Sequence, residues 1–535
     1  MQKRYGIHIL FILAVCFFAF FVNNGAVHVN SPEARNLVTA REMVEYHNWA
    51  TPTLNGESRM RNPPLPAWLA AVVEQVSPDN LILQRTVAGG MATLAVFFLY
   101  MFAIALTRSK LFGLLSALVL ATCFSMVMMG RAIDGYSHAY AFMLGTIFFF
   151  YRAAIALRTR WWDFVTAGLL LGLSFLSKGL ELFYTLFLPF LVAFFVLYRP
   201  SFRHKLWPTV LMLLVGGIVG SVWLWFALRS GAPVEPFMEM NARPWYYYWR
   251  FFTESGIWSL FLLTGLCGWC WIRERIALKK EYAFTVLWLL LALLLLTLFP
   301  GKSMRYLPSV LIPAALVIGH YVVDIFLRVR DEQLTPVDKI VFRLNAFLPA
   351  LLSLCVPVAL YVMFYSKLGL FLYMLFSFLF LLVSLSIFTG GIKFKPLKVF
   401  SGMMVMMILV ETFLICHLAD TFNNPEKNTI RAVRQMEELR DLPFYHPAGE
   451  ALRVEVVYEA GRRIVPLDLG SPPSSCSLPA ILVSSLPAEQ VLPEAWLERI
   501  APRQVGYYDN NSFRSRSSGL LCYVTLLEER EGATE

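Results

Sequence analysis

The sequence predicts a polytopic α-helical membrane protein that ends in a small α/β domain. Of its 535 residues, 58% are hydrophobic and only 15% are charged, and the mean hydropathy is +0.59. Soluble domains are nearer to half apolar and a quarter charged. Long apolar runs fill the chain up to Asp420, and the composition is mixed beyond it. We therefore predict a transmembrane domain over residues 1–419 and a second domain over residues 420–535.

The apolar runs predict about thirteen membrane-spanning helices, because each is close to the length that the bilayer core requires. Residues 7–22 follow Lys3 and Arg4. No convincing small-residue cleavage site comes after them, so we interpret this run as a retained anchor with a cytoplasmic N-terminus rather than a signal peptide. The other runs are 84–106, 111–129, 136–157, 162–177, 181–198, 206–228, 256–272, 283–299, 306–327, 345–365, 368–388 and 397–418.

The charges in the loops orient these spans. Basic residues are enriched on the cytoplasmic side of membrane proteins, and here every second loop is basic. An odd number of spans then places the C-terminal domain outside. The net charge of +10 comes mostly from these short clusters, so it does not indicate nucleic-acid binding. The basic loops contain Arg108 and Lys110; Arg152, Arg158 and Arg160; Arg199, Arg203 and Lys205; Arg273, Arg275, Lys279 and Lys280; Arg328, Arg330, Lys339 and Arg343; and Lys393, Lys395 and Lys398.

The first outer loop, within residues 28–80, contains an unusually polar stretch at 30–68. Ser31 and Pro32 suit the N-cap and first turn of a helix, and the proline-rich stretch 62–66 stiffens the chain before it returns to the membrane. Glu33 and Arg35 crowd the mouth of the first apolar run. The stretch is either a plain connecting loop or the working surface of a membrane enzyme, and its local order favours the second.

The later outer loops each place ionisable residues against a helix end. Charged groups at that depth are costly and are usually functional. For any single lysine or arginine, anchoring of a helix end is the better explanation, but acids and bases gather together on this side. His138 follows Asp134 by four residues, so it either joins a site there or makes an ordinary hydrogen bond. The charged residues in question are Asp134, Lys178, Glu181, Lys302 and Arg305.

The C-terminal domain has the pattern of a small α/β fold. We predict an amphipathic helix at 427–440, short strands at 452–458, 480–484 and 520–527, and a second helix at 489–500. Cys476 and Cys522 lie in this region and can pair if the compartment is oxidising.

The chemistry is narrowed by motifs that the sequence lacks. It has no P-loop, no glycine-rich dinucleotide fingerprint, no His-Glu-x-x-His and no Gly-x-Ser-x-Gly. An outward-facing site has no access to nucleotide donors, so an activated substrate would arrive as a lipid phosphate. Displacement of that phosphate needs cations on the leaving group and a carboxylate to take a proton. The candidate bases are Glu33 and Asp134; the candidate phosphate-binding residues are Arg35, Lys178, Lys302 and Arg305. No motif identifies a cofactor, although a divalent metal is compatible with this chemistry.

Several motifs resemble those of a known group of membrane glycosyltransferases of the GT-C type. The similarity covers about residues 1–330, and the first outer loop is its most specific part. The group comprises the bacterial aminoarabinose transferases and the dolichyl-phosphate-mannose protein mannosyltransferases. The matching residues are Pro32-Glu33-Ala34-Arg35-Asn36, Ala40-Arg41-Glu42-Met43, Asn48-Trp49-Ala50-Thr51-Pro52, Leu54-Asn55-Gly56, Pro63-Pro64-Leu65, Trp68, Asp134, Lys178-Gly179 and Lys302 to Pro308.

The resemblance implies an inverting transfer of a sugar from a polyprenyl-phosphate donor to lipid A, another glycan or a protein, on the outer face of the inner membrane. Two departures bear on the site. Pro32 stands where the family has an acid, which makes Asp134 a serious competitor to Glu33 as the base. Asn62 stands where the family often has a lysine, so a phosphate contact is either lost or moved to Arg59 or Arg61.

The main alternative to an enzyme is a transporter or flippase of a lipid-linked sugar. Transporters tend to have internal repeats and charges near the middle of the membrane. This sequence has no evident repeat, and its outer charges gather at one interface. A receptor with an outer binding domain would leave Glu33 and Asp134 unexplained. The sequence therefore favours the enzyme.

Overall fold

The computed structural model describes residues 3–60, 62–199, 204–229, 243–267, 279–299, 301–415, 423–424, 426–472, 476–512 and 517–530. The chain forms two compact units. Unit 1 contains Met1–Gly25, Arg61–Leu65 and Leu81–His417, and unit 2 contains Ala26–Met60, Pro66–Asn80 and Leu418–Glu535. Most of the predicted first outer loop thus belongs to the same unit as the C-terminal region. The predicted domains, 1–419 and 420–535, follow chain order and stay a prediction.

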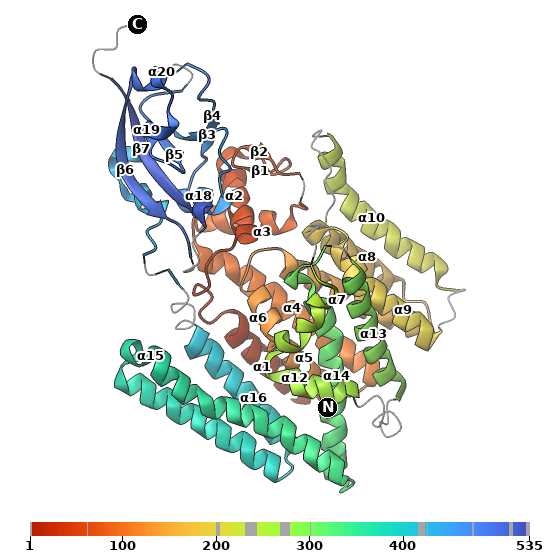
Figure 1. Ribbon diagram of the computed structural model, residues 1–535. Coiled ribbons are helices and arrows are strands. Elements are labelled where there is room, and N and C mark those ends of the chain that lie inside the picture. The colour runs from red at the N-terminus through yellow and green to blue at the C-terminus, as the bar shows by residue number, and fades with distance from the viewer. Residues whose placement is uncertain are drawn as a thin grey trace. The chain divides into compact units, whose positions relative to one another are not determined.

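Unit 1 is built from helices (Figure 1). Its elements are α1 (Lys3–Phe20), α4 (Leu81–Thr107), α5 (Lys110–Ala121), α6 (Phe124–Gly130), α7 (Tyr136–Ile155), α8 (Trp161–Lys178), the π-helix η1 (Phe183–Phe187), α9 (Leu188–Tyr198), α10 (Leu206–Arg229), η2 (Trp245–Arg250), α11 (Phe251–Glu254), η3 (Gly256–Trp258), α12 (Ser259–Cys267), α13 (Lys279–Leu298), η4 (Met304–Tyr306), α14 (Pro308–Arg330), α15 (Pro336–Ile392), α16 (Pro396–Leu409) and the π-helix η5 (Val410–Leu414).

Within the described ranges, eight helices of unit 1 are long and apolar enough to cross a membrane, or up to nine if one bent pair counts as a span. Shorter apolar helices accompany them, among them Gly6–Phe20, Phe183–Tyr198 and Gly256–Cys267. A polytopic helical protein is therefore confirmed, while the count of about thirteen spans stays a prediction. Helix α15 supplies two of the spans, Pro336–Val362 and Gly369–Ile392, which are separated where Gly369 takes a φ of +71°.

One predicted span, 111–129, is wrong as a single straight helix. Helices α5 and α6 share it and are bent by 69° at the break. Thr122 lies at the break, where its hydroxyl donates to the carbonyl of Leu118 at 2.8 Å and accepts from Trp258 Nε1 at 3.0 Å. Cys123 is extended, with φ −67° and ψ 132°. A side chain that enters the helical hydrogen-bond ladder is a common cause of a kink, and hydropathy cannot detect it.

Glycines allow α8 and α10 to pack closely in unit 1. A β-carbon at Gly168 would collide with the carbonyl oxygen of Met212, and one at Gly172 would lie 2.6 Å from Cβ of Val219. Small residues are typical of such contacts in membranes, because helices there gain little from the hydrophobic effect and depend on close packing. This packing positions the C-terminal end of α8, where Lys178 lies.

Unit 2 combines helices with a five-stranded sheet. The strand order is β4-β3-β5-β7-β6; β3 is parallel to β4 and β5, and β7 is antiparallel to β5 and β6. Figure 1 shows α18 beside α2 in this unit. The elements are α2 (Ser31–Tyr46), β1 (Thr53–Leu54), β2 (Glu57–Ser58), α3 (Leu65–Val76), η6 (Ile430–Gln435), η7 (Glu437–Leu439), β3 (Phe444–Pro447), α18 (Val454–Ala460), β4 (Val465–Leu467), β5 (Ala480–Ser484), α19 (Ala488–Val491), α20 (Glu494–Leu497), β6 (Ile500–Asp509), η9 (Ser518–Leu520) and β7 (Leu521–Glu529).

The small α/β fold predicted for the C-terminal region is confirmed, but several of its elements differ. The strands predicted at 480–484 and 520–527 are present as β5 and β7. The predicted strand at 452–458 is wrong: this segment forms α18, whose valines bury one side of a short helix that ends at Gly461 with φ +76°. Alternating apolar residues over so few positions do not separate a strand from a helical face.

The two helices predicted for this region are also wrong. Residues 427–440 form two 3₁₀ helices, because Met436 between them is extended, with ψ 108°. Residues 489–500 form α19 and α20, separated at Leu492 and Pro493. A proline disfavours the helical conformation of the residue before it. Ile500 then starts β6, a strand that the sequence analysis missed together with β3 and β4 because all three contain proline.

Candidate active site

Asp134 lies in unit 1, in the turn between α6 and α7. Gly135 has a φ of +87°, a conformation that glycine adopts at little cost. Oδ1 of Asp134 accepts a hydrogen bond from the backbone N–H of Tyr136 at 3.0 Å. The residue is only 6% exposed, and the N-terminal end of α7 favours its negative charge. The turn thus holds a buried carboxylate in one orientation.

Arg305 approaches this carboxylate from η4. Its Nε lies 3.9 Å from Oδ2 of Asp134, at the outer limit of an ion pair. The backbone around Arg305 is fixed independently, since Tyr140 Oη donates to the carbonyls of Arg305 at 3.2 Å and Tyr306 at 3.3 Å. Tyr140 is also 2.9 Å from the hydroxyl of Ser309. The main chain of Arg305 is therefore held in place by contacts that do not involve its guanidinium.

Lys178 and Glu181 complete the group at the C-terminal end of α8. The ammonium of Lys178 lies 4.3 Å from the ring centroid of Tyr136, a cation–π distance. The hydroxyl of Tyr136 donates to Oε2 of Glu181 at 2.8 Å. We call Asp134, Tyr136, Lys178, Glu181 and Arg305 the charged cluster. It contains two acids and two bases from four segments of unit 1.

The sequence analysis placed Asp134, Lys178 and Arg305 among the candidate residues, and the structure brings these three together. The sequence analysis named Glu181 among the charged residues of the outer loops without giving it a role, and it did not name Tyr136. The signal for Glu181 was its position in the same short outer loop as Lys178, but the loop alone does not show that Tyr136 connects them.

Two other candidates of unit 1 have different neighbours. Nζ of Lys302 donates to the backbone carbonyl of Arg243 at 3.1 Å. This hydrogen bond joins the Lys302 side chain to the segment just before η2. His138 is buried, and its Nδ1 lies 3.2 Å from the hydroxyl of Ser137. The hypothesis that His138 joins Asp134 gains no support from this hydrogen bond.

Glu33 and Arg35 lie in unit 2, on the first turns of α2. The predicted N-cap, Ser31, is wrong: Asn30 caps this helix, because its Oδ1 accepts from the backbone N–H of Glu33 at 3.1 Å, and Ser31 is already the first helical residue. Pro32 occupies the first turn as predicted. Glu33 is fully buried, whereas Arg35 is exposed. Arg61 lies outside the described residues. Because Glu33 belongs to unit 2 and Asp134 to unit 1, their convergence in one cavity stays a prediction.

Arg59 acts as an internal brace of unit 2. Its guanidinium donates to the carbonyl of Arg35 at 2.9 Å, the hydroxyl of Thr39 at 2.8 Å and Oδ1 of Asn36 at 2.9 Å. Burial, and then the nearby charge of Arg35, lower the pKa of Arg59 to about 9. These bonds hold the segment after β2 against α2. The alternative that Arg59 replaces the missing lysine at the phosphate is therefore less favoured, since both terminal nitrogens already have partners.

Ion pairs join the predicted first outer loop to the C-terminal region within unit 2. Asp79 pairs with Arg41 at 3.1 Å and also with Arg434. Glu42 accepts from Arg463 at 3.1 Å. Asn55 exchanges two hydrogen bonds with the backbone of Ile464, at 2.7 and 2.8 Å. The loop that carries Glu33 therefore takes its shape from a segment about 400 residues away in the sequence.

Asp79→Asn is expected to lower the unfolding temperature at pH 7 by about 2 to 4 °C, the shift that corresponds to roughly 1 kcal/mol in a unit of this size. Burial raises the pKa of Asp79, but Arg434 and Arg41 outweigh it, and the net pKa lies below its ordinary value. A carboxyl whose pKa is depressed in the folded state stabilises the fold at pH values above its ordinary pKa, and this stabilisation is lost as the pH falls through the folded pKa. The difference between parent and variant should thus begin to shrink near about pH 4, the ordinary carboxyl value, and vanish only below the folded pKa.

Glu438→Gln is the matched control for this measurement by differential scanning fluorimetry. Glu438 pairs with Arg503 at 3.6 Å, but both side chains are largely exposed, so no shift is expected. An equal shift in both variants, or one that persists at acidic pH, would contradict the assignment of the effect to the Asp79 pairs.

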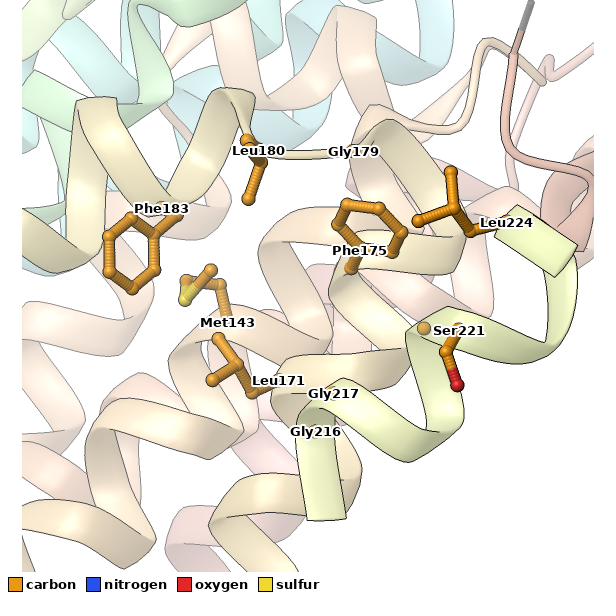
Figure 2. A pocket seen from close by; sticks show the side chains of 11 residues that line it. Met143, Leu171, Phe175, Gly179, Leu180, Phe183, Gly216, Gly217, Ser221 and Leu224 are labelled. Atoms are coloured by element: carbon orange, nitrogen blue, oxygen red, sulfur yellow. The ribbon is translucent and has the colours of Figure 1, made fainter. Parts of the chain in front are cut away.

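An apolar cavity of about 310 Å³ opens directly beside Lys178 along the chain, since Gly179 and Leu180 belong to its wall. Figure 2 shows Phe175, Phe183 and Leu180 around the same space, with the glycines of α10 on one side. Its one polar side chain, Ser221, donates to the carbonyl of Ile218 at 2.8 Å. The cavity therefore suits a hydrocarbon chain. Its lining residues are Met143, Leu171, Phe175, Gly179, Leu180, Phe183, Gly216, Gly217, Gly220, Ser221 and Leu224.

The described residues contain no group of three or more His, Cys, Asp or Glu side chains that could hold a metal ion. Cys476 and Cys522, which were predicted to be able to pair, are both buried free thiols. Both side chains are buried in unit 2, so their presence in the same region of the sequence was not enough to predict a disulfide bond.

The structure combines a unit of long apolar helices, in which acids and bases gather at helix ends, with a unit that contains an α/β sheet. The structure matches the crystal structure of ArnT from Cupriavidus metallidurans bound to undecaprenyl phosphate with a TM-score of 0.67 and 13% identity, over 98% of both chains. The apo form of the same protein matches equally well, with 14% identity. At this identity the match shows the fold, and the fold class predicted from the sequence is confirmed.

The sequence comparisons confirm the resemblance that the motifs indicated. The family model of dolichyl-phosphate-mannose-protein mannosyltransferases matches residues 61–226. The undecaprenyl phosphate-α-4-amino-4-deoxy-L-arabinose arabinosyl transferase 1 of Pseudomonas fluorescens is 25% identical over 61% of this chain. The corresponding transferase of Pseudomonas paraeruginosa is 26% identical over 67% of this chain and 66% of its own length. The chain spans about 61% of the length of the first of these relatives.

Proposed function

We propose that this protein transfers a sugar from a polyprenyl-phosphate donor to lipid A or another envelope acceptor. The observation that supports this most directly is the charged cluster next to an apolar cavity, because a lipid phosphate needs both. The relatives carry the name of undecaprenyl phosphate-aminoarabinose transferases, so 4-amino-4-deoxy-L-arabinose is the first sugar to test. The proposed location is the inner membrane, with the C-terminal region on the periplasmic side.

The cations of the charged cluster suit the departing phosphate. When the bond between the sugar and the phosphate breaks, negative charge develops on the phosphate oxygens, and preorganised donors at that point lower the barrier. Lys178 and Arg305 are the proposed donors in unit 1. Arg35, Arg61 and Lys302 remain further candidates for phosphate binding. A guanidinium can bind two phosphate oxygens together, whereas an ammonium acts as a point charge.

A carboxylate is the proposed general base. It would take the proton from the attacking hydroxyl of the acceptor while the sugar–phosphate bond breaks, so a single displacement inverts the configuration at the sugar carbon. Asp134 is the stronger candidate, because Oδ1 is fixed by the backbone of Tyr136 while Oδ2 faces the Arg305 guanidinium. Glu33 is the second candidate, and the replacement of its neighbouring acid by Pro32 weakens its case.

The apolar cavity is the proposed site for part of the donor's isoprenoid chain. Its volume of about 310 Å³ is at the lower end of the range for ligand pockets. Its wall continues directly into Lys178, so a chain that lies in the cavity would bring its phosphate end toward the charged cluster. This arrangement would bind the lipid by burial of hydrocarbon and the phosphate by charge.

Gly217→Phe is expected to raise the KM for the lipid donor by about 10-fold, which corresponds to 1.4 kcal/mol of lost binding. Gly217 lines the cavity, and a β-carbon there would meet nothing within 4 Å, so the new ring has room to enter the cavity without disturbing the helix. The measurement is the initial rate of transfer as a function of donor concentration.

Gly90→Phe is the matched control, since Gly90 on α4 is equally open and does not line the cavity. With a donor whose isoprenoid chain is shortened, the parent and the Gly217→Phe variant should have the same KM. An equal KM in the Gly217 and Gly90 variants would remove the proposed lipid site.

The function as a whole is tested by incubating the purified protein in detergent with an undecaprenyl-phosphate sugar and lipid A, and following the acceptor by mass spectrometry. Modified lipid A supports the proposal. A transporter or flippase makes no new bond, so unchanged acceptors in this assay, together with movement of the lipid-linked sugar in sealed vesicles, would replace the proposal by that alternative. Envelope lipids and glycoproteins from cells with and without the protein identify the acceptor.

A further inference from the structure

A buried cation in unit 1, Arg131, has no part in the proposed chemistry. The residue is only 1% exposed. Buried charges in membrane proteins are costly and are usually retained for a function. The role of Arg131 follows from what its side chain contacts.

Arg131 holds the C-terminal end of α1. Its Nε donates to the carbonyl of Ala19 at 2.8 Å, and Nη2 donates to the carbonyl of Phe18 at 3.2 Å. The last carbonyls of a helix have no partner within the helix, and a cation there is favoured by the helix dipole. Helix α1 also packs closely on this turn, because a β-carbon at Gly130 would lie 2.5 Å from Cδ1 of Phe20. The turn after α6 is thus attached to α1 by two adjacent residues.

The backbone of η5 also contacts the end of α1. Asn23, just beyond α1, donates from Nδ2 to the carbonyl of Glu411 at 3.4 Å and also contacts the carbonyl of Thr412. Arg85 of α4 donates to the carbonyl of Asn24 at 2.8 Å. The end of α1 is therefore held from η5 and α4 as well as by Arg131.

The proposed base lies three residues after Arg131 in the same turn. Asp134 is fixed on its other side by the N–H of Tyr136 and reaches Arg305 across 3.9 Å. A displacement of about 1 Å at a reacting group can cost on the order of 100-fold in rate. We propose that Arg131 is a positioning residue for Asp134: it fixes the 130–135 turn on the end of α1 and so sets the distance between Asp134 and Arg305. This inference rests on the proposed function.

Arg131→Lys tests the proposal while keeping the positive charge of the side chain. An ammonium on a shorter side chain cannot reproduce the two directed bonds to Ala19 and Phe18. We expect kcat to fall about 10- to 100-fold with the donor KM unchanged, and the backbone amides of the 130–136 turn to exchange hydrogen faster. Both measurements use the full-length protein.

Arg152 and Asp163 supply the matched control. They form an ion pair of unit 1 with a buried carboxylate and a partly exposed guanidinium, with Nε and Oδ2 at 2.8 Å, and they contact no member of the charged cluster in the described hydrogen bonds and ion pairs. Arg152→Lys should leave kcat and the exchange of the 130–136 turn unchanged. Parent-like kcat or parent-like exchange in Arg131→Lys would overturn the proposal. Faster exchange in a protein whose parent transfers no sugar would support the attachment of the turn and count against the proposed function alone.

Discussion

Asp134→Asn is expected to reduce kcat for sugar transfer about 100- to 10,000-fold, the range that a general base contributes. The amide is nearly isosteric, and its oxygen can still accept from the backbone N–H of Tyr136, which is 3.0 Å from Oδ1 in the parent. The turn should therefore keep its shape while the proton acceptor is lost. The measurement is the rate of transfer to lipid A at saturating donor, together with the unfolding temperature.

Glu33→Gln belongs in the same experiment, because it distinguishes the two candidate bases. If Asp134 is the base, Glu33→Gln should have the smaller effect on kcat. The reverse order would assign the role to Glu33. Full activity in both variants, with normal membrane insertion, would remove the carboxylate mechanism altogether.

Lys178→Met is expected to reduce kcat/KM for the lipid donor about 100- to 1,000-fold, which is the effect of removing one preorganised donor from developing negative charge. The ammonium lies over the ring of Tyr136 at 4.3 Å, next to the wall of the apolar cavity. Methionine keeps most of the length and the apolar stem of the side chain. The loss should therefore come from the charge rather than from packing.

Lys280→Met is a closely matched control for this variant. Lys280 also lies 4.3 Å from an aromatic centroid, that of Tyr198, but it belongs to the start of α13 and not to the charged cluster. Its replacement removes an equivalent cation–π contact and should leave transfer unchanged. Similar losses in both variants would mean that Lys178 matters only as a structural contact.

The residues of the charged cluster show how far sequence reasoning reached. Lys178 could be chosen from the sequence because Lys178-Gly179 at a helix end resembles a motif of the GT-C glycosyltransferases. Glu181 was visible only as one more acid in a loop. Its connection to the cluster passes through the hydroxyl of Tyr136, 45 positions earlier in the chain, and no local pattern encodes such a pairing.

The C-terminal region shows the opposite case, in which local patterns were read and several were wrong. Strand β5 was predicted from the short apolar run 480–484, and these five residues are buried in the middle of the sheet. Segment 454–460 was also predicted as part of a strand, but it packs as a helix against α2. Its partner is far away in the sequence, so composition and alternation alone did not distinguish the two outcomes.

The sequence by itself determined that this is a polytopic helical protein with a small α/β region, and that charged groups gather at one set of helix ends. Hydropathy and charge are properties of short segments, so both can be read directly from the sequence. Only the tertiary structure decided that the first outer loop is built together with the C-terminal region, that Arg59 is a brace, and that Arg131 attaches the Asp134 turn to α1. Each of these depends on hydrogen bonds and packing between distant segments, and such contacts form only when the whole chain has folded.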